Sequence, residues 1–116
     1  MTIAVDFERN PHAKPKVKVT HADLSSPTGQ AMIFELESDL RPHVVHIAPP
    51  CGTASKAREK PIPWWLKRRG VPEPRQLRSS EHVRGLPDLT GTELLRVVKA
   101  NSIYDFTIEL CIRRHE

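Results

Sequence analysis

The sequence predicts an α/β fold built on about three parallel strands, because strand and helix signals alternate along its first half. Apolar or alternating runs indicate strands at Ile3–Val5 and Val17–Thr20, with a loop marked by Asn10-Pro11 between them. After a helix, Val44–Ala48 is more continuously apolar than Val17–Thr20, as is typical of a central parallel strand. Strands that alternate with helices favour a parallel sheet with right-handed crossovers.

Capping residues predict the ends of two helices. Ser26-Pro27 combines a capping hydroxyl with a proline at the first helical position, and Arg41-Pro42 predicts where that helix stops. Thr90 to Glu93 matches a capping box that starts a long final helix. Its apolar residues fall on one stripe, typical of an amphipathic helix: Leu94, Val97, Val98, Tyr104, Ile108 and Cys111.

The 116 residues suffice for a single small domain in three parts. Residues 1–55 form the βαβ part, residues 56–87 a long loop without a clear period, and residues 88–116 the final helix. The net charge of +4 is concentrated in the loop, which holds nine Lys or Arg and three Asp or Glu, together with Trp64-Trp65. Such a segment can bind polyanions such as DNA, or it can be a solvated basic loop.

The composition favours an intracellular protein, nuclear or cytoplasmic, that does not enter a membrane. The longest apolar run is far too short to span a bilayer, and the first residues lack the basic and apolar regions of a secretory signal. Two cysteines in different contexts do not indicate a disulfide framework.

Polar residues follow each predicted strand, at the edge where parallel sheets bind ligands. Asp6 is placed to accept hydrogen bonds from ribose hydroxyls, and Asp23 could accept one from the amine of an adenine. The alternative is that each aspartate is a turn or cap residue, which is a common role.

Cys51 is the residue whose surroundings in the sequence most specifically indicate a chemical role. Two prolines stiffen the chain before it, and Gly52 allows close approach of a substrate. Lys56 and Arg58 are near in sequence, and neighbouring positive charge favours a nucleophilic thiolate. The alternative is a small buried apolar residue.

A zinc site at His43, His46 and Cys51 is disfavoured. On a strand, residues three apart point to opposite faces, and no further Cys or His pair completes a tetrahedral set. We therefore predict no metal ligand.

The segment Val45–Ser55, with its Pro49-Pro50-Cys51-Gly52 core, resembles the proline-cysteine loop of C5-cytosine DNA methyltransferases. It looks most like divergent phage-like and retroelement-borne members. Further similarity lies in Leu77–Ser80, Gly85–Pro87 and Ala100–Tyr104.

The resemblance implies part of a Rossmann-like class I methyltransferase sheet and S-adenosylmethionine as methyl donor. It implies that Cys51 attacks C6 of a flipped cytosine, and that Asp6, Asp23 and Pro49 contact the cofactor. The residues expected to contact DNA are Ser55, Lys56, Arg58, Lys67, Arg68 and Arg69.

Several family motifs are not found in these 116 residues. The glycine-bearing cofactor loop should precede Asp6, and a Glu-Asn-Val type motif should follow the last helix. The Gln-x-Arg-x-Arg motif and the target-recognition region are missing too. We therefore expect a partial methyltransferase that is inactive alone and that a complementing polypeptide could restore.

Two other interpretations remain open. The chain could be a non-catalytic nucleic-acid-binding module built on residues 56–87, where tryptophans stack on bases and basic residues meet phosphates. It could also be a different cysteine-dependent enzyme, although no His or Asp partner is identifiable. Only the methyltransferase interpretation predicts affinity for S-adenosylmethionine.

Overall fold

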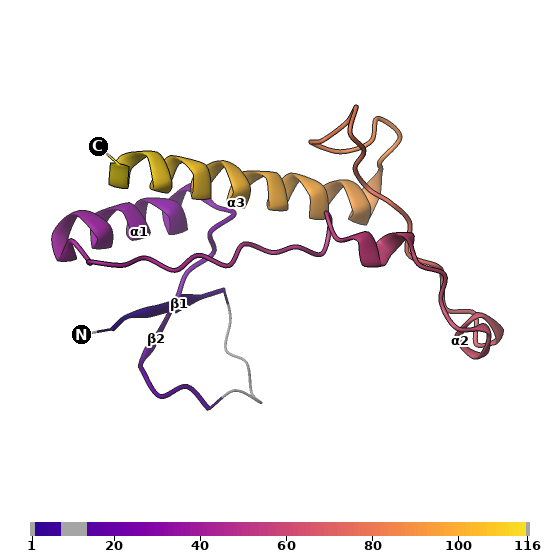
Figure 1. The fold of residues 1–116 in the computed structure, drawn as a ribbon, viewed down its shortest axis with the longest axis horizontal. Helices are drawn as coiled ribbons and strands as arrows, with labels where there is room; N and C mark the ends of the chain where they lie inside the picture. The colour runs from indigo at the N-terminus through magenta and orange to yellow at the C-terminus, as the bar shows by residue number, and fades with distance from the viewer. Residues whose placement is uncertain (1, 8–13, 116) are drawn as a thin grey trace. The chain divides into compact units, whose positions relative to one another are not determined.

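The computed structural model describes residues 2–7 and 14–115 and has mixed α and β structure, mostly helical with a long C-terminal helix (Figure 1). Its elements are β1 (Ala4–Asp6), β2 (Val19–His21), α1 (Pro27–Leu40), a 3-10 turn (Lys56–Glu59), α2 (Trp64–Arg68) and α3 (Gly91–His115). The chain divides into two compact units. Unit 1 is Met1–Ala48 with Ser102–Glu116, and unit 2 is Pro49–Asn101.

The first two predicted strands pair in parallel, as expected. Ala4 lies opposite Val19 and Asp6 opposite His21. One further bond continues the pairing, in which the backbone N–H of Ala22 donates to the carbonyl of Asp6 at 2.9 Å. The predicted loop around Asn10-Pro11 lies outside the described residues.

The prediction of a third strand at Val44–Ala48 is wrong. The segment is irregular in the structure, and Val44 is 82% exposed. A run of β-branched residues prefers extended backbone, but a strand also needs a neighbour that supplies a hydrogen-bond ladder and covers its apolar side chains. The two-stranded sheet of β1 and β2 does not serve as that neighbour.

Helix α1 has the predicted ends. The Ser26 hydroxyl accepts a hydrogen bond from the Gly29 N–H at 3.2 Å, and Pro27 opens the helix. Arg41 ends it in the left-handed conformation at φ 43°, and its N–H donates to the Glu37 carbonyl. Gly29 is required by a close approach, since a Cβ there would lie 2.0 Å from the Asp23 carbonyl oxygen.

In unit 1, α1 packs against the second half of α3. The rings of Phe34 and Phe106 lie 5.1 Å apart between centroids, and the Arg113 guanidinium lies 3.8 Å from the centre of the Phe34 ring. Arg114 bonds Glu37 at 2.9 Å. These contacts join residues more than seventy positions apart in the sequence, so tertiary packing holds this part of the fold together.

In unit 2, the core consists of Leu77, Leu89 and Val97, with Leu86 packed against them. The predicted start of α3 is confirmed, but the apolar stripe is wrong in detail. Leu94, Val98 and Ile108 are exposed, as is Cys111. The buried residues of α3 are instead Val97, Ala100, Phe106 and Leu110.

The predicted irregular loop of residues 56–87 contains two short helical turns. Pro63 begins α2 by accepting hydrogen bonds from the N–H groups of Leu66 and Lys67 at 3.0 and 3.2 Å. Gly70, at φ +74°, follows its end. From Pro63 to Gln76 every residue is exposed except Leu66, and we call this segment the excursion. Within residues 2–7 and 14–115, no helix is both long and apolar enough to cross a bilayer.

Candidate functional site

The loop that carries Cys51 is ordered by hydrogen bonds to its backbone. Cys51 is exposed, and its carbonyl accepts from the Ala54 N–H at 3.0 Å. The Nε of Arg58 donates to the Gly52 carbonyl at 2.7 Å. Ser55 caps the 3-10 turn by accepting from the Ala57 N–H at 3.2 Å. The structure therefore places an accessible thiol on a loop whose following residues are held in place.

Arg58 and Ser55, expected to contact DNA, thus have structural contacts as well. The Arg58 guanidinium still has N–H groups other than Nε, and Arg58 is half-buried. Lys56 is exposed on the same turn. The contact of these three residues with DNA stays a prediction.

A second arginine, Arg78, clamps the same loop from farther along the chain. Its Nη2 donates to the Thr53 hydroxyl at 3.0 Å, and its Nη1 donates to the Asn101 amide oxygen at 2.6 Å and to the Val83 carbonyl at 2.8 Å. Asn101 in turn donates to the Arg84 carbonyl at 2.8 Å. Thr53 is only 9% exposed. We call Thr53, Arg78 and Asn101 the loop clamp.

Sequence reasoning missed the clamp. Arg78 looked like one more positive charge of the basic segment, and Thr53 only like a neighbour of Cys51. One signal was available: Asn101 lies four residues after Val97, on the helix face that is buried in unit 2. A polar residue on a buried face needs a hydrogen-bond partner, and here that partner is Arg78.

Beside the clamp is a small hollow of about 50 Å³, between Thr53–Ser55, Arg58 and Gln76–Arg78. Small-molecule sites typically enclose about 300–1,000 Å³, so this hollow cannot enclose a nucleoside.

Asp6 is the last residue of β1 and Asp23 lies two residues after β2, and because the two strands are parallel, both aspartates lie at the same end of the sheet. Both are exposed. The Asp6 carboxylate accepts from the Phe7 N–H at 2.7 Å, and the Asp23 carboxylate accepts from the Ser25 N–H at 2.9 Å and the Ser25 hydroxyl at 2.6 Å. Asp23 therefore shapes the turn before α1. Cofactor contact by either residue stays a prediction, as does contact by the exposed Pro49 of unit 2.

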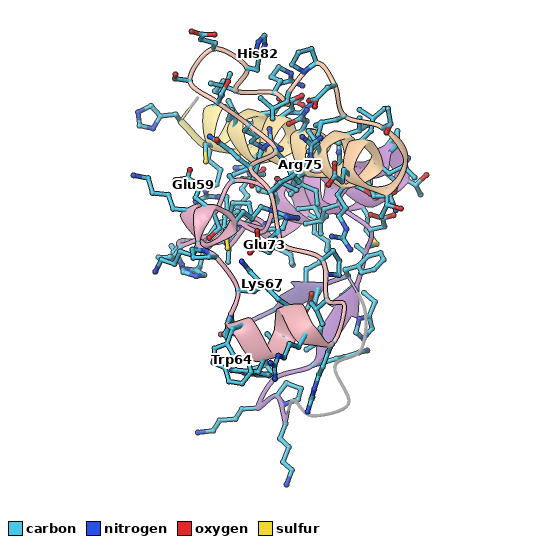
Figure 2. The ribbon with its side chains drawn as sticks, turned by 90° about the vertical axis from the view of Figure 1, so that its right-hand side faces the viewer. Glu59, Trp64, Lys67, Glu73, Arg75 and His82 are labelled. Atoms are coloured by element: carbon cyan, nitrogen blue, oxygen red, sulfur yellow. The ribbon has the colours of Figure 1, made fainter. Side chains whose placement is uncertain are left out.

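The basic residues at the end of α2, with Arg69 as its C-cap, have two kinds of partner. The Arg68 guanidinium lies over the Trp64 ring, 5.1 Å from its centre, and that of Arg69 lies 6.0 Å from the centre of the Trp65 ring. Lys67 instead bonds the Glu73 carboxylate at 2.5 Å, and Figure 2 shows it pointing toward that residue. We call Trp64, Trp65, Arg68 and Arg69 the α2 surface.

Arg75, at the end of the excursion, is held by two carboxylates. Hydrogen bonds to Glu93 at 2.9 Å and to Asp88 at 3.2 Å raise the pKa of Arg75 above its ordinary value. The guanidinium is charged at any physiological pH, so this contact responds to salt rather than to pH.

Among the described residues, no three His, Cys, Asp or Glu side chains gather closely enough to hold a metal ion. Comparison with known proteins found no matching family model, no matching curated protein and no matching solved structure.

Proposed function

We propose that this chain is part of an S-adenosylmethionine-dependent DNA cytosine-C5 methyltransferase of the Rossmann-like class I type, with Cys51 as its nucleophile. The observation that supports the proposal is the exposed Cys51 thiol on a loop that is tied through Gly52 and Thr53. A nucleophile must be reachable by its substrate and held in a productive position. The sequence likeness of Val45–Ser55 to the proline-cysteine loop supplies the reaction class.

In the proposed reaction the Cys51 thiolate forms a bond to C6 of cytosine, which pushes electron density onto C5. S-adenosylmethionine, when bound, would supply the methyl group to C5 and leave as S-adenosylhomocysteine. Transfer of the C5 proton to water or another base would then let the bond between sulfur and C6 break, giving 5-methylcytosine and the free Cys51 thiolate. Asp6 and Asp23 would contribute contacts to the cofactor's ribose and adenine.

We predict that the 116-residue chain does not turn over by itself. The reaction requires the cofactor, the nucleophile and a group that assists at the ring, and lack of acid assistance alone typically costs about 10²–10⁴ in rate. Incubation with labelled S-adenosylmethionine and cytosine-rich DNA should give no label above a Cys51→Ser control. Label should appear in a mixture with a polypeptide that carries the glycine-bearing loop and the Glu-Asn-Val type motif.

The two cysteines provide a matched control for that experiment. In the complemented mixture, Cys111→Ser should keep full labelling, because Cys111 lies on α3, whereas Cys51→Ser should abolish it. Loss of labelling in both variants, or in neither, would argue against Cys51 as the nucleophile.

A second candidate, a nucleic-acid-binding module without catalysis, is favoured by the exposed α2 surface within the most basic segment of the chain. Binding should weaken steeply with salt, because phosphate contacts release counterions. Changing Lys67, Arg68 and Arg69 together to Ala should weaken binding to every DNA sequence about equally. If the triple variant binds DNA as the parent does, residues 56–87 are only a solvated loop.

A further inference from the structure

We propose that the α2 surface is a stacking site for unpaired bases of single-stranded DNA. The proposal rests on nucleic-acid binding by residues 56–87 and deepens it, by naming the form of DNA and the side chains that meet it. Charge alone cannot distinguish a surface for duplex DNA from one for a single strand. The arrangement of the two tryptophans does so.

The indoles of Trp64 and Trp65 are both exposed. Trp64 is 67% exposed and Trp65 is 48% exposed, on an excursion where only Leu66 is half-buried. Each indole is a large flat apolar surface, and leaving it in water is unfavourable unless a partner covers it. A nucleobase is a flat partner of suitable size, and stacking on an aromatic side chain contributes about 1–3 kcal/mol per base.

The guanidinium groups of Arg68 and Arg69 each lie over one of the two indoles. Each arginine lies four residues after the tryptophan that it covers, so the pairs occupy one turn of helix each. Because Trp64 and Trp65 are consecutive, the two pairs project about 100° apart around α2. Each guanidinium restrains its ring and adds positive charge beside it, which suits a base flanked by its phosphate.

Lys67 has a different kind of partner from Arg68 and Arg69. The sequence groups Lys67 with Arg68 and Arg69, but the structure pairs Lys67 with Glu73. The charge available for phosphates on α2 therefore comes from the two arginines beside the indoles. Each indole that can stack on a base therefore has a positive charge beside it, and aromatic side chains next to basic ones are the combination that single-strand-binding proteins use.

Duplex DNA fits this surface less well. Helix α2 has 5 residues, a length of about 8 Å, whereas reading the major groove requires a longer helix or a ribbon. In a duplex, the base faces are stacked on one another and are unavailable to the indoles.

The test uses the full chain and its intrinsic fluorescence, because Trp64 and Trp65 are the only tryptophans in the sequence. A 15-nucleotide oligo(dT) and a duplex of the same length are titrated separately. Binding is followed by the anisotropy of labelled DNA and, in parallel, by tryptophan emission. We expect oligo(dT) to quench the emission strongly and the duplex to quench it little.

The variants make the test specific. Trp64→Ala with Trp65→Ala should weaken oligo(dT) binding at least tenfold and change duplex binding less than twofold. Arg68→Ala with Arg69→Ala should also weaken oligo(dT) binding. The matched control is Arg75→Met with Asp88→Asn, which removes a cation and a carboxylate that it bonds without changing net charge, and it should change oligo(dT) affinity less than twofold.

Two outcomes would overturn the stacking site, and they differ. If oligo(dT) binds but the double tryptophan variant binds it within twofold of the parent, nucleic-acid binding stands and the stacking site fails. If neither DNA binds, both proposals fail. Circular dichroism of each variant shows whether the helical content is retained, so a loss of binding can be assigned to the side chains.

Discussion

Two regions of unit 2 hold their arginines in opposite ways. At the loop clamp, Arg78 is half-buried and donates to a hydroxyl, an amide oxygen and a backbone carbonyl. In the excursion, Arg68 and Arg69 lie over exposed indoles and Arg75 bonds two exposed carboxylates. Arginine thus holds the loop at Thr53 in place in the loop clamp, whereas in the excursion it lies on an exposed surface.

The difference follows from burial. A buried donor or acceptor that loses its partner keeps its desolvation cost, so the clamp is specific to one geometry. Exposed groups exchange a partner for water at little cost, so the excursion can change partners. The proposed role of Cys51 as a nucleophile would require the first property, and the proposed binding of a flexible single strand would require the second.

The largest expected effect is at the clamp. Arg78→Ala should lower the free energy of unfolding by about 2 kcal/mol, because it leaves Thr53, Asn101 and the Val83 carbonyl without that donor. Urea unfolding followed by circular dichroism measures the effect. Arg75→Ala, which removes a guanidinium three residues away, should leave the midpoint unchanged. Equal losses for the two variants would mean that burial does not separate the two regions.

An intermediate effect concerns the mobility of Cys51. In a Cys111→Ser background, a trifluoromethyl tag on Cys51 reports its motion by ¹⁹F NMR line width. Arg78→Lys keeps the charge but cannot span Thr53 and Asn101 with one ammonium, so the line should narrow. Thr53→Val should narrow it as well, and Arg75→Lys should not.

If Arg78→Lys and Thr53→Val leave the line width unchanged, the clamp does not position the Cys51 loop. That result would not touch the proposed methyl transfer, since the measurement involves neither DNA nor cofactor. The positioning of the Cys51 loop by the clamp and the proposed methyl transfer are therefore tested separately.

The smallest expected effect is at the ion pair of the excursion. Glu73→Gln should leave stability unchanged, because an exposed pair contributes little. It frees the Lys67 ammonium, so DNA affinity should rise a few-fold at low salt. With oligo(dT), the slope of log affinity against log salt should steepen by about 0.7, the value expected for one additional phosphate contact on a single strand. An unchanged slope would mean that Lys67 does not reach the DNA even when free.

Local sequence signals predicted the ends of elements well. Ser26 and Pro27 start α1, and the helix stops before Arg41-Pro42 as predicted. The start of α3 just after Thr90 is confirmed too. These signals succeed because caps and prolines act through the backbone within a few residues, so their effect does not depend on distant parts of the chain.

Signals that depend on a distant partner were less reliable. The apolar character of Val44–Ala48 was real, but whether it forms a strand depends on a neighbour with free backbone groups. The apolar stripe of α3 likewise predicted the helix correctly, but it did not predict which of its side chains are buried. Val97 packs with Leu77 and Leu89, whereas Phe106 packs with Phe34, so each half of α3 is buried by different residues.

The sequence by itself determined the helix ends, the parallel pairing of the first two strands and the basic character of residues 56–87, whereas the exposure of Cys51 came from the structure. Only the tertiary structure decided which partners the basic side chains have, and therefore which of them lie on an exposed surface that a ligand can reach. Arg78 bonds Thr53 and Asn101, and Lys67 bonds Glu73, while Arg68 and Arg69 remain beside exposed indoles. The physical reason is that a charge has the same identity wherever it stands in a sequence. Its energy depends on the partners and the solvent that folding places around it.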